Sequence, residues 1–142
     1  MRALLDVNVL VALLDSDHVD HSRAWDWLGA ELGDGWASCP LTENGFVRII
    51  SQPRYPNPIR ASQAIELLGQ ATATEHHEFW AADVSVLDPR RVDASRVHGP
   101  KQVTDLYLLA LAVAHDGRFV TFDDAIPMSA VPAARPEQLV VL

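Results

Sequence analysis

The 142-residue sequence predicts an α/β fold built on a parallel sheet. Short apolar runs, several rich in β-branched and aromatic residues, alternate with longer segments of helical periodicity. The connections between these runs are long enough for parallel crossovers. An apolar fraction of 49% and a charged fraction of 21% are near globular averages, and the length suits one domain over residues 1–142.

The first half of the chain contains two predicted strands, each followed by helical sequence. Residues 3–5 are apolar and end on a carboxylate, which indicates a short buried strand, whereas the apolar run at 9–14 fits either a helix or more strand. Helical spacing of apolar residues predicts a helix over 22–32. Residues 36–39 are the second predicted strand, and Pro40 suits the first turn of a helix that ends near residue 50.

The middle of the chain carries a loop, a helix and a third strand. Three prolines mark residues 51–58 as a loop. Residues 60–73 are predicted to be helical. The apolar face of this helix is formed by Ala64, Ile65, Leu68 and Ala71. A strand is predicted at 78–82, and the polar segment 88–100, which contains prolines and a glycine, is a connection.

The last third contains the strongest helical pattern. A wide apolar face predicts a helix over 104–115, with Gly117 as its C-terminal cap. Residues 118–122 are a β-branched and aromatic strand that ends at a pair of aspartates. After a proline-rich loop, residues 139–142 form the last predicted strand.

Composition excludes several classes of protein. The net charge of −8, from 11 Lys and Arg against 19 Asp and Glu, argues against a simple basic nucleic-acid-binding module. A single cysteine rules out an intramolecular disulfide framework and a Cys-rich zinc site. No apolar run approaches the roughly 18 residues of a membrane span. We therefore expect a cytoplasmic protein with no membrane partner.

Acidic residues recur at equivalent places in the predicted fold. Asp6 and Asp123 end strands, and Glu43 and Asp105 lie in the first turns of helices. Because ligands of parallel sheets bind beyond the carboxyl ends of the strands, we expect these side chains to converge. Converging carboxylates repel one another, and a divalent cation removes that penalty. Oxygen ligands favour Mg²⁺ or Mn²⁺ over Zn²⁺, so the pattern predicts metal-assisted phosphodiester hydrolysis.

Three other interpretations of these acids remain open. Each acid alone fits a helix N-cap or a solvated strand end, and Asp105 could simply favour a helix dipole. A phosphatase-like hydrolase could use Asp6 as its nucleophile, although such enzymes need a second Asp two residues later, where this chain has Asn8. The chain could also be a non-catalytic binding domain with a vestigial acidic site.

Read in order, these motifs resemble the PIN-domain nucleases, and more closely the VapC-type toxins of bacterial toxin–antitoxin pairs. The similarity spans nearly the whole chain and is carried by LDVNVL at 5–10, TE at 42–43, TD at 104–105 before LLALA at 108–112, and TFD at 121–123. A subgroup abundant in mycobacteria is similar in CPLTENGFVR at 39–48 and QVTD at 102–105. Each motif alone is weak, but the ordered set is specific.

The resemblance implies a three-layer α/β/α sandwich around a parallel sheet. It also implies an Mg²⁺- or Mn²⁺-dependent endoribonuclease that leaves a 3′-hydroxyl. The implied assembly is a homodimer that is inhibited by a cognate VapB-like antitoxin. The implied substrates are structured RNAs such as transfer RNA or ribosomal RNA loops.

The resemblance also assigns site residues. The family's acidic quartet is matched by Asp6, Glu43, Asp105 and Asp123. The polar positions beside it are matched by Asn8 and Thr121. Asp124 is the second choice for the fourth acid, because consecutive strand residues point to opposite faces and only one of the pair should bind the ion. By this resemblance Asp6 and Asp105 bind the metal directly, and Glu43 and Asp123 bind it directly or through water.

Other residues near the predicted site have weaker assignments. Arg48 projects from the helix that bears Glu43, and we expect it to contact an RNA phosphate. His18 lies near the same crevice, where surface hydrogen bonding or capping is the favoured role and RNA contact the alternative. The apolar face of helix 60–73, with the neighbouring helix that ends at residue 50, fits either an antitoxin groove or core packing.

Overall fold

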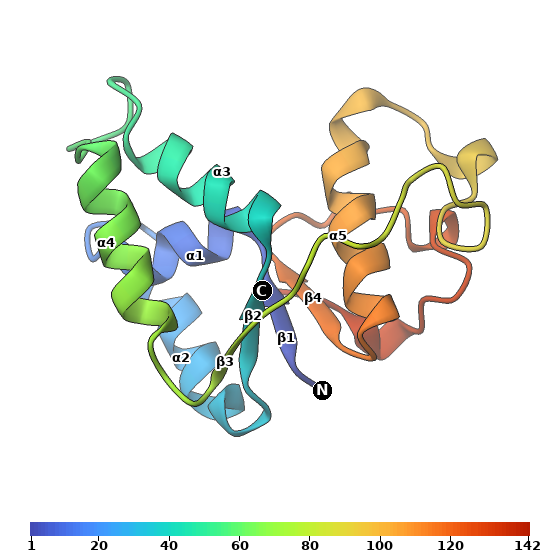
Figure 1. The fold of residues 1–142 in the computed structure, drawn as a ribbon, viewed down its shortest axis with the longest axis horizontal. Coiled ribbons are helices and arrows are strands. Elements are labelled where there is room, and N and C mark those ends of the chain that lie inside the picture. The colour runs from blue at the N-terminus through green and yellow to red at the C-terminus, as the bar shows by residue number, and fades with distance from the viewer.

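The computed structural model describes residues 1–142 and contains one sheet of five strands, all parallel, in the order β3-β2-β1-β4-β5 (Figure 1). The strands are β1 (Ala3–Leu5), β2 (Trp36–Ser38), β3 (His77–Phe79), β4 (Arg118–Thr121) and β5 (Leu139–Val141). β1 is central, because Leu4 pairs with Ala37 of β2 on one side and with Phe119 of β4 on the other. The predicted parallel sheet is confirmed.

Helices cover both faces of this sheet. One side carries α1 (Val7–Leu14), α2 (His21–Glu31), α3 (Pro40–Ile50) and α4 (Ala61–Thr72), and the other carries α5 (Val103–Ala114) (Figure 1). Short 3-10 turns lie at Leu32–Asp34, Ala94–Arg96, Pro100–Gln102, Met128–Ala130 and Pro136–Gln138. None of the helices is long and apolar enough to cross a lipid bilayer. This arrangement is the three-layer α/β/α sandwich that the resemblance implied.

The sheet separates two hydrophobic cores. Successive strand side chains point to opposite faces, so Leu4 and Phe119 pack with α5, whereas Leu5 and Val120 pack with α1, α3 and α4. All four side chains are fully buried. Because β1 and β4 are apolar on both faces, they form the centre of the molecule, and the polar residues that follow them are held at its middle.

The segment that the sequence left ambiguous, 9–14, belongs to α1. The helix begins immediately after Asp6, whose Oδ1 accepts the Val7 N–H at 2.7 Å. This contact satisfies one of the free N–H groups at the start of a helix. The local cap therefore decides between strand and helix where periodicity could not.

The third strand lies earlier than the predicted 78–82. β3 ends at Phe79, and Trp80 N–H makes one further ladder bond to Ser38 at 2.8 Å. The Trp80 side chain then enters the α5 core, where its ring stacks on His115 at 4.3 Å. Burial of this ring on the α5 side is the physical reason that the strand ends before residue 82.

Gly117 does not have the conformation expected of a helix-capping glycine. The residue with positive φ after α5 is Asp116, at φ 51°, while the Gly117 N–H bonds Ala112 O at 2.8 Å and closes the helix. Close packing explains why residue 117 is a glycine. A Cβ there would lie 2.8 Å from the Arg2 carbonyl oxygen and 2.6 Å from the Trp80 ring.

The predicted apolar face of α4 is only partly buried. Ala64 and Leu68 pack into the core, but the Ile65 side chain is 59% exposed. Ile65 lies one residue beyond Ala64 around the helix and so faces the groove between α3 and α4 rather than the sheet. This part of the predicted face is available to a partner.

Gly117→Ala is expected to destabilise the fold by about 1–3 kcal/mol, because the new methyl group meets backbone at Arg2 and the Trp80 ring. Gly69→Ala in α4 is the matched control. Its Cβ meets open space, so it should stabilise the helix by about 0.5–1 kcal/mol. Urea unfolding of both variants measures the difference, and equal effects at the two positions would contradict the packing role of Gly117.

Candidate active site

The carboxyl edge of the sheet gathers several helix N-termini. α1 follows β1 and α3 follows β2 almost without a loop, and α5 starts at this edge because it runs back to the beginning of β4 (Figure 1). Asp6 precedes α1, and Asp105 lies in the first turn of α5. The positive ends of these helix dipoles therefore face the acidic side chains and favour negative charge there.

The Thr121 hydroxyl connects the polar residues at this edge. Thr121 Oγ1 donates to Asp6 Oδ2 at 2.6 Å and accepts from Asn8 Nδ2 at 3.2 Å and from the Asp123 N–H at 3.1 Å. The Asn8 Oδ1 accepts the Phe122 N–H at 3.3 Å. Thr121 is fully buried. The structure thus places Asn8 and Thr121 beside Asp6, where the family motif led us to expect them.

Three of the predicted acids act on one another electrostatically. Burial is the main cause of a raised pKa at Asp6, and the neighbouring charge of Asp123 adds to it against the hydrogen bonds from Thr121 and Val7. Burial, followed by the charges of Asp6 and Asp123, raises the pKa of Asp105 to about 6. β4 ends at Thr121, so Asp123 has left the strand and faces the other acids, while Asp124 is exposed.

The Glu43 carboxylate forms its hydrogen bond away from the other three predicted acids. Its Oε1 accepts from Ser38 Oγ at 2.6 Å, and Ser38 Oγ in turn lies 2.8 Å from His77 Nε2. Because the ionised carboxylate can only accept, the serine proton points to Glu43 and the His77 Nε2–H donates to Ser38. Burial lowers the pKa of His77, and the Glu43 charge opposes this shift. Glu43 is not among the charges that shift the pKa of Asp6 or Asp105.

The chemistry of the donor set fits a hard divalent cation. Asp6, Asp105 and Asp123 supply oxygen atoms in a partly buried site, and their mutual repulsion is the kind that a bound cation relieves. In this arrangement no three His, Cys, Asp or Glu side chains are placed to hold an ion together. The roles of all four acids as metal ligands therefore stay predictions.

A cavity of about 340 Å³ opens beside Asp6. Its walls include His18 from the turn after α1, and Ile49 and Tyr55 from α3 and the loop that follows. Sequence reasoning placed His18 near this crevice but did not single out Tyr55, Ser38 or His77. A buried serine on an apolar strand was a usable signal, since such a hydroxyl needs a partner. No local pattern revealed Tyr55, because its neighbours at the site are distant in sequence.

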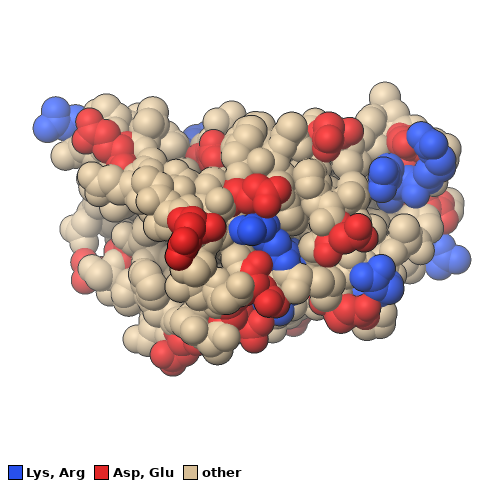
Figure 2. All heavy atoms as spheres, turned by 60° about the horizontal axis from the view of Figure 1, so that its bottom comes forward, with Lys and Arg blue, Asp and Glu red and all other residues tan.

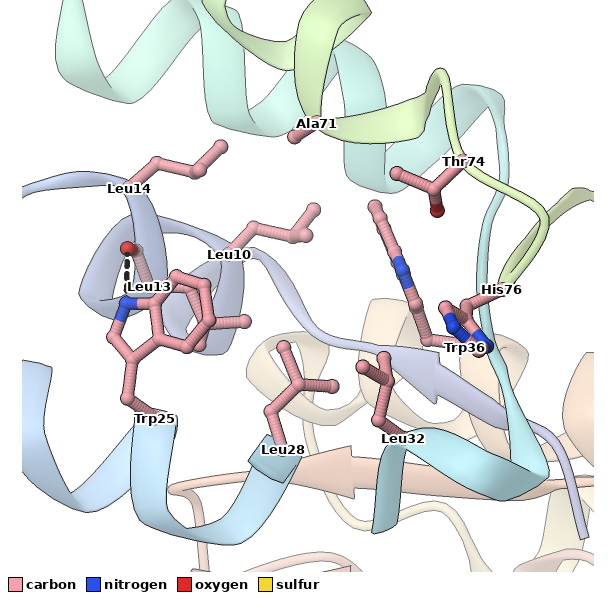
Figure 3. Close-up of a pocket in the computed structure, with 10 residues that line it drawn as sticks. All are labelled: Leu10, Leu13, Leu14, Trp25, Leu28, Leu32, Trp36, Ala71, Thr74 and His76. Carbon is pink, nitrogen blue, oxygen red and sulfur yellow. Dashed lines mark hydrogen bonds between the residues drawn. The ribbon is translucent and has the colours of Figure 1, made fainter. Parts of the chain in front are cut away.

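A second cavity, of about 270 Å³, is apolar and lies away from the acids (Figure 3). It is bounded by α1, α2 and α4 and by the segment before β3, with the Leu10, Leu28 and Trp36 side chains pointing into it (Figure 3). The Trp25 indole on its rim donates to Leu13 O at 2.9 Å. No acidic side chain lines this cavity, so it offers no carboxylate to bind a divalent cation.

Surface charge is mixed on the face of the molecule shown in Figure 2. Acidic and basic side chains are interspersed on this face, and no continuous basic surface covers it. Arg48 is exposed on α3 and forms no ion pair within the chain, whereas Arg90 and Arg96 pair with Asp88 and Asp93. Arg48 is therefore free to contact a phosphate, as predicted, and its role in RNA binding stays a prediction.

Comparisons with known proteins agree with this geometry. Residues 3–132 match the family profile described as PIN domain. The chain is 64% identical to ribonuclease VapC44 of Mycobacterium tuberculosis over 142 residues, 100% of both chains, and 44% identical to ribonuclease VapC38 of the same organism over 87% of this chain and 86% of that one.

Two solved structures share the fold. One is the VapBC2 complex of Rickettsia felis bound to a DNA fragment from its promoter, with a TM-score of 0.63 at 12% identity over 100% of this chain and 98% of that chain. The other is Mycobacterium tuberculosis VapC20, described as a sarcin–ricin loop cleaving toxin, with a TM-score of 0.61 at 11% identity over 94% and 99%.

Thr121→Val is expected to lower the free energy of unfolding by about 1–3 kcal/mol, because it keeps the side-chain volume but leaves Asp6, Asn8 and the Asp123 N–H without their shared partner. Thr121→Ser keeps the hydroxyl and loses one buried methyl group, at a cost of about 1 kcal/mol. Urea unfolding measures both. A valine variant as stable as the wild type would show that the network contributes nothing.

Asp105→Asn is expected to stabilise the metal-free protein at neutral pH. The raised pKa of Asp105, about 6, means that this carboxyl favours the folded state when protonated, and that its contribution is lost as pH rises from about 4 through about 6. With allowance for solvent screening of this half-buried side chain, the variant should be more stable by about 1–2 kcal/mol above pH 7. Urea unfolding in chelator at several pH values tests this. A difference in stability between the variant and the wild type that persists at pH 4 would contradict the electrostatic cause.

Proposed function

The chain belongs to the PIN-domain family, and from this premise we propose that it is the RNA-cleaving toxin of a VapBC-type toxin–antitoxin pair, acting in the cytoplasm. One observation carries the proposal. A chain similar over its full length to a protein named a ribonuclease also has Asp6, Asp105 and Asp123 at the carboxyl edge of its sheet, near enough for their charges to interact. This edge is where ligands of parallel α/β sheets bind.

Asp6, Asp105 and Asp123 would hold Mg²⁺ or Mn²⁺, with Glu43 as the fourth predicted ligand. When bound, such an ion supplies an activated water and stabilises charge on the oxygens of the phosphodiester. The chain's own groups do the positioning. Thr121 fixes the orientation of the Asp6 carboxylate, and Asn8 fixes Thr121 and the backbone after β4. Ser38 and His77 hold Glu43 at the neighbouring strand end.

The partners follow from the same premise. One structural relative is a VapBC complex, which supports a VapB-like antitoxin as the partner of this chain. The groove between α3 and α4, lined by Val47, Leu68 and the exposed Ile65, is the surface that we propose for an antitoxin segment. Assembly as a homodimer, and transfer RNA or ribosomal RNA as substrate, belong to this proposal as well.

The two rival functions are less well supported by the site. A phosphatase using Asp6 as nucleophile needs a second acid two residues later, and here Asn8 occupies that place and is bonded to Thr121 and Phe122 N–H. A binding domain with a vestigial site gains nothing from keeping mutually repelling carboxylates partly buried, because they destabilise the fold without a cation.

Metal-dependent cleavage of RNA is the decisive test. Purified protein incubated with total bacterial RNA should release discrete fragments with Mg²⁺ or Mn²⁺ and none in chelator. Asp6→Asn should reduce the rate by at least about a hundredfold, because a group that stabilises charge in the transition state is lost. Asp124→Asn is the matched control and should retain activity, since Asp124 is exposed and its charge does not shift the pKa of Asp6 or Asp105. Gel electrophoresis of the fragments gives the readout.

Thermal unfolding separates the possible failures of that experiment. Mn²⁺ should raise the melting temperature of the wild type and not of Asp6→Asn, because only a ligand of the folded state stabilises it. Cleavage that continues in chelator would refute the metal dependence. An absence of both cleavage and a Mn²⁺ shift would refute the nuclease and support the binding domain.

A further inference from the structure

The cavity beside Asp6 has two chemically different sides. One side carries Asp6 and Asn8, which belong to the network around Thr121. The other is formed by Val11, Ile49 and Tyr55, which bear no charge. At about 340 Å³ the cavity is at the small end of the range of about 300–1,000 Å³ that small-ligand sites occupy.

Tyr55 is held firmly in this wall although it lies in a loop. Its hydroxyl donates to Asp15 Oδ2 at the end of α1, and its backbone N–H bonds Gln52 O at 2.9 Å. Asp15 is itself fixed, because its Oδ1 accepts the Asp17 N–H at 3.0 Å. Burial and the hydrogen bond to Asp15 raise the pKa of Tyr55, so the phenol stays a donor. The ring is thus an aromatic surface in a set position.

His18, which lines the same cavity, has a defined N–H donor. Its Nδ1 accepts the Asp20 N–H at 3.0 Å, which places the proton of the neutral ring on Nε2. Nε2 forms no hydrogen bond within the chain. The cavity therefore combines one aromatic ring with one unsatisfied N–H donor, both from segments outside the acidic cluster.

Electrostatic repulsion determines which part of an RNA can bind against this side of the cavity. The carboxylate of Asp6 lines the cavity and that of Asp15 lies behind Tyr55, so a phosphate placed against the wall would be repelled. A nucleobase is neutral, stacks on an aromatic ring whatever its sequence, and carries acceptors for an N–H donor. We propose that this cavity binds an unpaired base of the RNA beside the bond that is cut, with the base stacked on Tyr55 and hydrogen-bonded by His18. This inference rests on the proposed function.

Binding of short RNAs tests the stacking. Fluorescein-labelled oligo(A) and oligo(U) decamers are titrated by anisotropy with Mn²⁺ present, and every protein carries Asp105→Asn so that the RNA stays intact. Adding Tyr55→Ala should weaken oligo(A) binding by about 5- to 150-fold, the range for loss of one stacked base. Oligo(U) should lose less, because purines stack more strongly. The ratio of the dissociation constants for oligo(U) and oligo(A) should therefore move toward one.

Three further variants separate stacking on Tyr55 from other contributions to RNA binding. Tyr55→Phe keeps the ring and should bind within about threefold of the parent protein. Arg54→Ala, an exposed neighbour that does not line the cavity, should leave the preference between the two probes unchanged. His18→Asn retains an acceptor for the Asp20 N–H but removes the Nε2 donor, and should weaken binding by about 2- to 10-fold.

Several outcomes would overturn the inference. Unchanged binding by folded Tyr55→Ala would remove the stacking surface, and an equal loss in Tyr55→Phe would show that the contact with Asp15 matters instead. If Tyr55→Ala fails to fold by circular dichroism, Tyr55→Leu keeps the apolar volume without an aromatic face and is expected to show the same loss. If the wild type cuts RNA, and Tyr55→Ala cuts and binds RNA as well as the wild type does, the base-binding subsite is refuted but the proposed function is not. If the wild type cuts no RNA, the proposed function itself is refuted.

Discussion

The hydroxyl of Thr121 joins three segments that are far apart in the chain: the end of β1, the first turn of α1 and the residues after β4. One proton and two lone pairs are all that a hydroxyl has, and Asp6, Asn8 and the Asp123 N–H use each of them. Because Thr121 is fully buried, none of these bonds has water as a substitute. The orientation of the Asp6 carboxylate, and with it the geometry of the whole edge, depends on this one side chain.

Charge imposes the second constraint on this edge. Asp6 and Asp105 have raised pKa values because they are partly buried near Asp123, and no basic side chain neutralises them. Helix N-termini reduce the repulsion but do not remove it. Such a cluster lowers the stability of the metal-free protein. Functional sites commonly reduce stability in this way. A cation that binds only the folded state recovers this free energy.

Sequence reasoning went furthest where periodicity and order along the chain were strong. The parallel sheet was predictable because short apolar strands such as 3–5 alternate with helical segments such as α5. The three layers were expected only from the resemblance to PIN-domain nucleases. The end of β3 and the role of Gly117 were not, since both depend on where the Trp80 ring packs against distant residues. At the site, motifs placed Asp6, Asn8 and Thr121 together. The buried Ser38 hydroxyl indicated that a partner was needed, but its contacts with Glu43 and His77 were not foreseeable, because they depend on how β2 pairs with β3.

The position of β4 in the sheet has a consequence for the chain during its synthesis. β1 is translated first, yet its partner β4 and the residues Thr121 and Asp123 belong to the last part of the sequence. A growing chain that has not yet reached residue 121 therefore has Asp6 without its hydroxyl partner and an acidic cluster that is missing one member. Since domains fold from the N-terminus during synthesis, the first core can form before this edge is complete. The acidic edge of the sheet is thus completed only after β4 has been made and has paired with β1.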